Sequence, residues 1–565
     1  MHHSLRRACA AGLAVASVAL IVSGPVDAAT KTTKKKAATT KKAVATKAGA
    51  VTTGAPATTA APAPASTAAP TTAPKAVAVA TDPNGDIRIG YPLGPRNMDP
   101  VGVNGTGDIP LLTPVYDRLI RYNVDGSLTP MLATSWNFNT DGSVLEMKLQ
   151  PNVKFHDGTP FNAAAVKANI ERGQTHPRST LKAALSSIEG IDTPDELTVR
   201  FRVKKAQAAG LLYDFSFIAG MMVSPAAMSK PDLDQYGVGT GPYIIKPGTF
   251  SPNLRGTYIK APGTYWGDAQ LQRLASFEIL AFPDEQARFS ALRTGQIDVM
   301  TNITGSTIKQ ITDLAKGGNF TFNRVETGAV QGIRMNLKSA SLSDLRVRQA
   351  INFGLNREAI AQAAFQGACS PTTQMFAKGK PGYVAALDSL YKYDLVKAKQ
   401  LLQEAGGKKI TLSGASVAPF QNLANVVQGQ LSAIGIDQDL PTLTSAAAIP
   451  AFRRGELESW SFTVASGIDP AVMLFNTVAG GIDSQGPTDK VLKAAVGMLD
   501  QLQDSASKTK FLEAVNRAAM EDAALIPICF AISGTVGRKG IVGLEEDPWV
   551  SQQVFSPVGY GVAAK

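Results

Sequence analysis

Hydrophobic and polar residues alternate strictly in one short segment of the chain. Leu145, Met147 and Leu149 occupy every second position, and the residues between them, Glu146 and Lys148, are charged. A period of two residues is typical of a β-strand with one buried face and one face in water. The pattern therefore predicts a strand over this segment.

A turn and a helix are predicted directly after this strand. Residues 157–160 have the sequence Asp-Gly-Thr-Pro, which is typical of a turn. Asn162 can cap the helix that follows, and Val166 and Ile170 stand four residues apart on one face of it. The segment is therefore predicted to fold as strand, turn and helix.

Other patterns predict further elements. Ile87–Gly90 begins a strand, and residues 111–120 are predicted to form a short amphipathic helix. The apolar run at 526–532 predicts one more strand. Because 565 residues exceed the length over which one hydrophobic core keeps growing, at least two domains are expected.

The first 28 residues predict a secretory signal peptide. Arg6 and Arg7 precede an apolar run over residues 8–22, and Val26-Asp27-Ala28 resembles a cleavage site. The apolar run is short for a membrane span, and no other stretch approaches the needed length. We therefore expect an extracytoplasmic protein, located in the periplasm or the cell envelope.

A lipid anchor is not expected from this leader. The nearest cysteine, Cys9, lies before the apolar run and not at its end, so the leader has no lipobox.

Residues 29–81 predict a disordered tether. The segment is almost entirely Ala, Thr, Lys, Pro, Gly, Ser and Val, and it contains no aromatic or acidic residue. Such a composition cannot bury enough apolar surface to offset the entropy lost on ordering. The tether carries eight lysines; without them and the charges of the leader, the formal net charge falls from +11 to +2.

The basic charge therefore belongs to the tether and not to the folded part, which argues against a nucleic-acid partner. The lysines can contact anionic polymers of the cell envelope, or the segment can serve only as a soluble spacer; both interpretations remain open.

The sequence gives no reason to expect an enzyme. Histidine occurs four times, at positions 2, 3, 156 and 176, which excludes an HExxH zinc motif. No CxxC, GxSxG or P-loop sequence is present. His156 is interpreted as a hydrogen-bonded turn residue. No catalytic residue, metal site or cofactor is therefore predicted.

Several motifs occur in a fixed order along the chain, and together they resemble bacterial extracellular solute-binding protein family 5. This family contains the dipeptide, oligopeptide and nickel-chelate receptors of ABC importers. The motifs are the block 128–172, Gly239–Tyr243 (GTGPY), Tyr265–Gly267 (YWG), Ala291–Asp298, Asn336 with Asp344–Ala350 (DLRVRQA), Asn356–Glu358 and Tyr393-Asp394.

The resemblance implies an α/β, two-lobed fold of the periplasmic-binding-protein type with a ligand cleft between the lobes. It places the first lobe at 82–328, with an accessory subdomain at about 123–238. The second lobe covers 329–532, and 533–565 returns to the first. It also implies a substrate receptor that acts as a monomer and delivers a small solute, oligopeptide first among the candidates, to a membrane permease.

The resemblance also places the ligand site. In peptide-binding relatives a loop of the first lobe and a strand of the second hold the ligand by main-chain hydrogen bonds. The matching loop contains Asn104, Gly105 and Thr106, and the matching strand covers 460–466. Along that strand Trp460 shares one face with Phe462 and Val464, while Thr463 and Ala465 share the other with Ser461. Trp460 belongs either to the core or to the cleft wall.

One departure from the family concerns the ligand's amino group. Peptide receptors of the family commonly carry an Asp four residues before the proline of this loop, and counting back from Pro470 gives Ser466. Asp469 can instead contact an ammonium group, or it can cap a helix that begins at Pro470. Both interpretations of Asp469 remain open.

Two cysteines remain after the leader is removed. An even number in an oxidising compartment favours a disulfide between Cys369 and Cys529, which fall in the same predicted lobe. Two independent buried thiols are the alternative, since Cys529 lies in an apolar strand.

Two further functions remain open. One is a receptor for a non-peptide solute, such as a metal chelate or an oligosaccharide. The other is an adhesion or sensing protein of the cell envelope on the same fold, attached through its lysine-rich tether.

Overall fold

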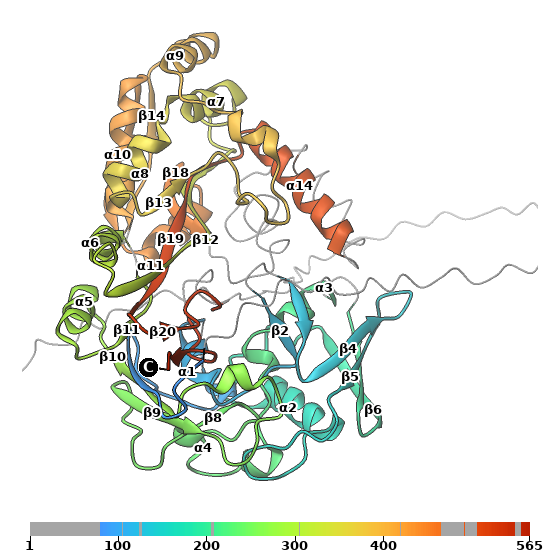
Figure 1. Cartoon of the computed structure of the whole chain (residues 1–565). Coiled ribbons are helices and arrows are strands. Elements are labelled where there is room, and N and C mark those ends of the chain that lie inside the picture. The colour runs from blue at the N-terminus through green and yellow to red at the C-terminus, as the bar shows by residue number, and fades with distance from the viewer. Residues whose placement is uncertain are drawn as a thin grey trace, which may run out of the picture. The chain divides into compact units, whose positions relative to one another are not determined.

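The computed structural model (Figure 1) describes most of the chain after residue 79. The described residues are 80–103, 106–123, 127–204, 208–303, 305–417, 420–464, 491, 505–547 and 555–564. Over these ranges, none of the helices has the length and apolar character needed to span a bilayer.

A nine-stranded mixed sheet forms the centre of the fold. Its strand order is β18-β12-β19-β11-β1-β10-β9-β8, with β13 also paired to β19. The strands are β1 (Asp86–Tyr91), β8 (Tyr243–Ile245), β9 (Arg255–Lys260), β10 (Ser276–Ala281), β11 (Val299–Met300), β12 (Phe320–Met335), β13 (Cys369–Pro371), β18 (Ser459–Val464) and β19 (Leu525–Arg538).

The long strands β12 and β19 run antiparallel to each other through this sheet (Figure 1). The first part of β12 pairs with residues 532–538, and the second part pairs with 525–530 and with β18. The register shifts between Glu326 and Val330. The lobe boundary predicted at 328–329 falls within this irregular stretch. The domain limits themselves stay a prediction.

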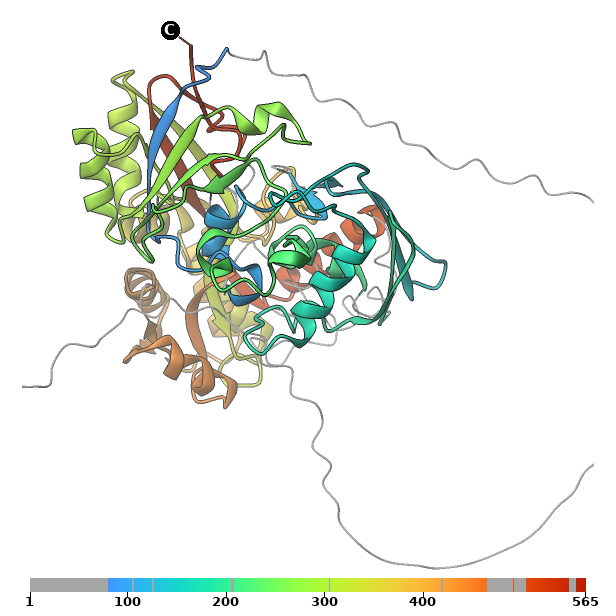
Figure 2. The same ribbon diagram turned by 90° about the horizontal axis from the view of Figure 1, so that it is seen from below.

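A second, four-stranded sheet has the order β4-β5-β7-β6. Helix α2 packs on it, as the teal elements of Figure 2 show. The helix and the sheet contribute to one hydrophobic cluster. Asn162 caps α2 as predicted, because its side chain accepts a hydrogen bond from the Ala165 amide. The elements are β4 (Ala133–Phe138), β5 (Val144–Leu149), β6 (Ile188–Asp195), β7 (Thr198–Val203) and α2 (Ala163–Thr175).

The remaining helices and short strands surround the two sheets. The helices are α1 (Ile109–Leu112), α3 (Ala208–Asp214), α4 (Leu233–Tyr236), α5 (Glu285–Thr294), α6 (Gly305–Ala315), α7 (Leu345–Gly354), α8 (Arg357–Phe365), α9 (Leu395–Glu404), α10 (Gln421–Ala433), α11 (Ser445–Arg453) and α14 (Ser505–Glu521). The short strands pair as β2 (Ile120–Tyr122) with β3 (Leu128–Pro130), β14 (Ile410–Ser413) with β16 (Ile436–Asp439), β15 (Ser416–Val417) with β17 (Thr442–Leu443), and β20 (Ile541–Val542) with β21 (Gly561–Val562).

An ion pair with a buried carboxylate joins helix α2 to the segment after β1. Arg172 donates two hydrogen bonds to the Asp99 carboxylate, at 2.8 and 2.6 Å. Asp99 is 1% exposed, and it also accepts from the Val101 amide. The two-pronged geometry fixes both position and direction, so α2 and this segment are held in one arrangement.

The helix predicted over residues 111–120 is wrong for most of its length. Helix α1 ends at Leu112, and the chain reaches strand β2 at Ile120. Pro114 is one reason, since a proline has no amide hydrogen to donate to the carbonyl four residues earlier. The hydrogen bonds of Asp117, described below, are another.

The described chain also begins earlier than the predicted end of the tether. Thr81 forms a bridge with Ala563, and the Asp82 amide donates to the carbonyl of Val562. Figure 2 shows this C-terminal segment beside the blue first strand. The pairing partner lies more than 480 residues away in sequence, which is why composition alone did not place Thr81 in the fold.

Cys369 and Cys529 form a disulfide that joins β13 to β19, with their Cα atoms 5.5 Å apart. Both residues are buried. The bridge lies inside the hydrophobic cluster around α7, α8 and α10.

Candidate functional site

The loop that contains the predicted ligand residues is anchored at its end by a buried carboxylate. Arg96 donates to both oxygens of Asp108, at 3.0 and 2.8 Å, and Asp108 is 1% exposed. The Tyr91 hydroxyl donates to the Gly107 carbonyl at 2.9 Å. Thr106 begins a 3-10 turn that ends at Asp108. The end of the loop is therefore held in place by two side chains of the preceding segment, Tyr91 and Arg96.

The beginning of the loop is anchored as well. The Thr180 hydroxyl donates to the carbonyl of Val103, and the Thr180 amide donates to the carbonyl of Val101 at 3.1 Å. Asn104 and Gly105, the other two predicted ligand residues here, lie outside the described residues.

Trp460 is buried in this structure. It is 8% exposed and packs in a hydrophobic cluster, with its ring 6.3 Å from the Phe452 ring. The Arg334 guanidinium lies 5.9 Å from the Trp460 ring and 4.5 Å from the Phe462 ring. The burial of its aromatic surface favours the core alternative for this side chain, and a role in the ligand site stays a prediction.

Thr463 lies on the opposite face of the same strand and is half-buried. Its hydroxyl donates to the Gln331 side-chain oxygen at 2.6 Å, across the pair that β18 forms with β12. Strand β18 is the last strand of the sheet at this side among the described residues. Ala465, Ser466 and Asp469 lie outside the described residues.

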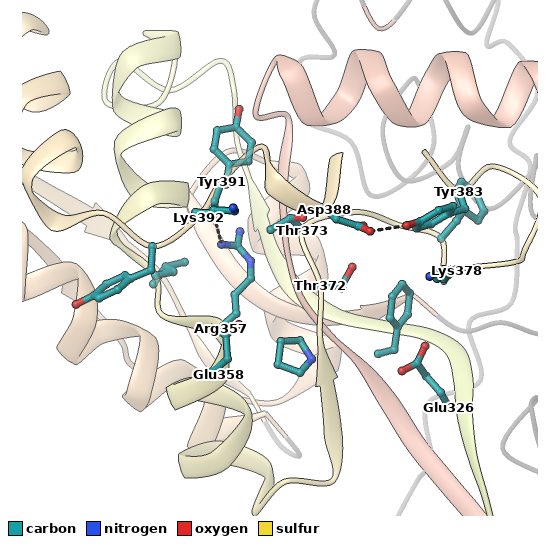
Figure 3. A pocket seen from close by; sticks show the side chains of 15 residues that line it. Glu326, Arg357, Glu358, Thr372, Thr373, Lys378, Tyr383, Asp388, Tyr391 and Lys392 are labelled. Atoms are coloured by element: carbon teal, nitrogen blue, oxygen red, sulfur yellow. Dashed lines mark hydrogen bonds between the residues drawn. The ribbon is translucent and has the colours of Figure 1, made fainter. Parts of the chain in front are cut away.

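A pocket of about 520 Å³ was not predicted from the sequence (Figure 3). Its lining comes from separate segments, and no single motif marks it. The residues that line it are Glu326, Leu355, Arg357, Glu358, Pro371, Thr372, Thr373, Phe376, Lys378, Tyr383, Asp388, Tyr391, Lys392, Tyr393 and Phe530.

Arg357 contributes a buried positive charge to this pocket. It is 4% exposed, and burial lowers the pKa of its guanidinium to about 10. Its donors bind the carbonyls of Pro527, Asn352 and Tyr391 at 2.8, 3.1 and 3.4 Å, and the Asn352 side-chain oxygen at 2.8 Å. These acceptors are all neutral, so hydrogen bonding satisfies Arg357 without cancelling its charge.

The structure gives His156 the turn role expected from the sequence. One ring nitrogen bonds the Gly241 carbonyl at 2.8 Å, and the Gly239 amide donates to the other at 3.3 Å. Burial lowers the pKa of His156 below its ordinary value. Among the described residues no group of three or more His, Cys, Asp and Glu side chains is placed to hold a metal ion.

The sheet architecture and the position of the anchored loop define an α/β, two-lobed fold of the periplasmic-binding-protein type. Solved structures share this fold. HbpA2 of Haemophilus parasuis superposes with a TM-score of 0.74 at 23% identity, covering 85% of this chain and 100% of that chain. The unliganded open form of the periplasmic murein tripeptide-binding protein MppA superposes with a TM-score of 0.75 at 17% identity, covering 86% and 99%.

Sequence comparison identifies the family. The model of "Bacterial extracellular solute-binding proteins, family 5 Middle" matches residues 127–484, and the chain belongs to this family. The glutathione-binding protein GsiB of Escherichia coli (strain K12) is 31% identical over 349 residues. That alignment covers 60% of this chain and 66% of the length of GsiB.

Proposed function

We propose that this protein is the extracytoplasmic substrate-binding component of an ABC importer. It binds a short peptide between the lobes and delivers it to a membrane permease. Family membership supports the receptor role, and the 31% identical relative is named for glutathione, itself a tripeptide. Two observations support the peptide assignment: both ends of the 103–106 loop are anchored, and β18 is an edge strand among the described residues.

The edge position of β18 explains why an extended backbone suits this site. An edge strand presents main-chain N–H and C=O groups that no neighbouring strand uses. A peptide can add to such an edge through its own backbone, with little dependence on its side chains. The loop at 103–106 would cover the ligand's other side, and Gly105 would allow a close backbone approach.

The substitution at Ser466 predicts how the ligand's amino group is recognised. Removing the carboxylate partner of a buried ammonium typically costs about 2–5 kcal/mol. A receptor that relied on such a partner would therefore reject N-acetylated peptides strongly. With Ser at this position, we expect free and N-acetylated forms of one peptide to bind with affinities that differ by less than about a hundredfold, roughly 2.7 kcal/mol.

Isothermal calorimetry with matched free and acetylated peptides tests this expectation. A larger loss on acetylation would mean that a carboxylate holds the amine, and Asp469 is then the first candidate. In that case Asp469→Asn should reproduce the loss. Asp232→Asn is the matched control, because Asp232 is exposed and makes no side-chain capping bond.

A further inference from the structure

The pocket of Figure 3 is called the lobe 2 pocket because all of its lining except Glu326 lies within 329–532, the range predicted for the second lobe. Among the described residues, its lining includes none of the 103–108 loop and none of strand β18, so it is distinct from the described part of the proposed peptide site. It is formed by the start of helix α8, the segment from β13 to α9, and one residue each of β12 and β19. A volume of about 520 Å³ falls within the range of small-molecule pockets.

Charges of both signs line the pocket in equal number. The acids are Glu326, Glu358 and Asp388, and the bases are Arg357, Lys378 and Lys392. A ligand with a single charge would meet as much repulsion as attraction in such a lining. An amphoteric ligand, with one ammonium and one carboxylate, can be attracted at both ends.

Two of the six charged groups are held by protein partners. Arg357 is held by the neutral oxygens described above. Asp388 accepts hydrogen bonds from the Tyr383 hydroxyl and from the Gln374 amide. The other four, Glu326, Glu358, Lys378 and Lys392, are exposed and form no hydrogen bond or ion pair with any residue in the described part of the chain. They are therefore available to a ligand.

The charged groups are distributed over two sides of the pocket. In Figure 3 Glu326, Asp388 and Lys378 lie toward one side, while Arg357, Lys392 and Glu358 lie on the other, so each side carries both signs. Two bases and one acid give the second side an excess of positive charge, which attracts a carboxylate. Two acids and one base give the first side an excess of negative charge, and Glu326 supplies an acceptor there for an ammonium group.

Aromatic side chains form much of the remaining wall. Phe376 and Phe530 are buried and belong to one hydrophobic cluster, whereas Tyr383 and Tyr393 are more accessible. Flat apolar surfaces of this kind favour a ligand that carries an aromatic or other apolar group. From the balanced charges, their separation and these walls, we infer that the pocket binds an amphoteric molecule of about amino-acid size with an apolar side chain.

Calorimetry of the mature chain with L-phenylalanine and its two blocked forms tests this second site. L-Phenylalanine carries both charges, N-acetyl-L-phenylalanine only the carboxylate, and L-phenylalaninamide only the ammonium. The contacts are at exposed side chains, so we expect each blocked probe to bind about 3- to 10-fold more weakly than the amino acid. A single amino acid lacks the extended backbone on which the proposed peptide site depends, so the two sites can fail independently.

Substitutions locate the binding. Glu326→Gln and Lys392→Met should each weaken L-phenylalanine binding by about 3- to 10-fold and leave the melting temperature unchanged, because both side chains are exposed and unpaired among the described residues. Glu189→Gln and Lys182→Met are the matched controls, since these exposed residues lie outside the pocket. They should bind like the wild type.

Three results would overturn the inference. One is the absence of binding by L-phenylalanine at millimolar concentration. Another is equal binding of the blocked probes, which would show that the charges are not recognised. The third is an unchanged affinity in both pocket variants, which would place the amino acid elsewhere on the protein.

Discussion

At the scale of single residues, buried Asp117 explains why two motifs of the chain occur together. Its carboxylate accepts hydrogen bonds from Thr240 at 3.0 Å, Tyr265 at 2.9 Å and Trp266 at 2.7 Å. These donors belong to the GTGPY and YWG motifs, which lie more than 120 residues further along the chain. Both motifs therefore supply structural hydrogen bonds to one buried carboxylate.

Steric contacts explain why the GTGPY motif has glycine at positions 239 and 241. A side chain at Gly239 would collide with the carbonyl oxygen of Val115, and one at Gly241 would come within 2.5 Å of the carbonyl oxygen of Pro114. Only glycine allows the two backbones to approach this closely.

Replacing Asp117 by Asn should destabilise the protein by about 1–3 kcal/mol, because an amide cannot accept hydrogen bonds through both of its ends. Thermal or urea unfolding measures the loss. Asp195→Asn is a suitable control, since that carboxylate is exposed and bonds only within its own turn.

The stability difference between the wild type and Asp117→Asn should depend on pH. Burial raises the pKa of Asp117 above its ordinary value, despite three hydrogen bonds that lower it. The folded state then binds more protons than the unfolded state, so the stability contributed by this residue falls as the pH rises from the ordinary carboxyl value to the raised one. The stability of the wild type relative to Asp117→Asn should therefore increase on acidification through that interval. A difference that is constant or decreases on acidification would contradict this.

At the scale of elements, the disulfide ties a short strand to a long one. Strand β13 has three residues, and it pairs with β19 at residues 529–531. The segment that follows β13 supplies much of the lining of the lobe 2 pocket. The Cys369–Cys529 bridge therefore holds the start of that segment against the central sheet.

Removing the bridge with Cys369→Ala and Cys529→Ala together should lower the free energy of unfolding by about 2–4 kcal/mol, because the bridge closes a long loop of the unfolded chain. Urea unfolding of the wild type and the double variant under non-reducing conditions measures this. Thiol titration of the denatured mature protein should find no free thiol. Two free thiols per chain would rule the bridge out in the secreted protein.

At the scale of the whole molecule, the register shift in β12 suggests where a hinge acts. Between Glu326 and Val330 the ladder with β19 is interrupted, and the two strands form hydrogen bonds on both sides of the interruption. A local irregularity in paired strands can absorb a change in backbone angles without breaking the ladder on either side. This point lies next to the lobe boundary predicted from the sequence.

Peptide binding should therefore close the two lobes around this hinge. Closure is favoured only to the extent that the ligand binds the closed form more tightly. Small-angle scattering should show a smaller radius of gyration at saturating peptide, and the melting temperature should rise with peptide concentration above the dissociation constant. An unchanged radius at saturation would contradict a closing receptor.

Local sequence determined much of the secondary structure. The alternation at 145–149 and the cap at Asn162 predicted β5 and α2, because strand period and helix capping depend on residues a few positions apart. The order of the motifs predicted the family and the two-lobed fold, which the comparisons confirm.

Only the tertiary structure decided the roles of individual side chains. On a strand of that pattern Trp460 could be core or cleft wall, and its burial involves Arg334, which lies more than 100 residues away in sequence. The helix predicted at 111–120 was wrong for a similar reason. Asp117 forms hydrogen bonds with residues that are distant in sequence, which a local pattern cannot indicate. The lobe 2 pocket was missed because charged residues from separate segments form a site only after the fold brings them together.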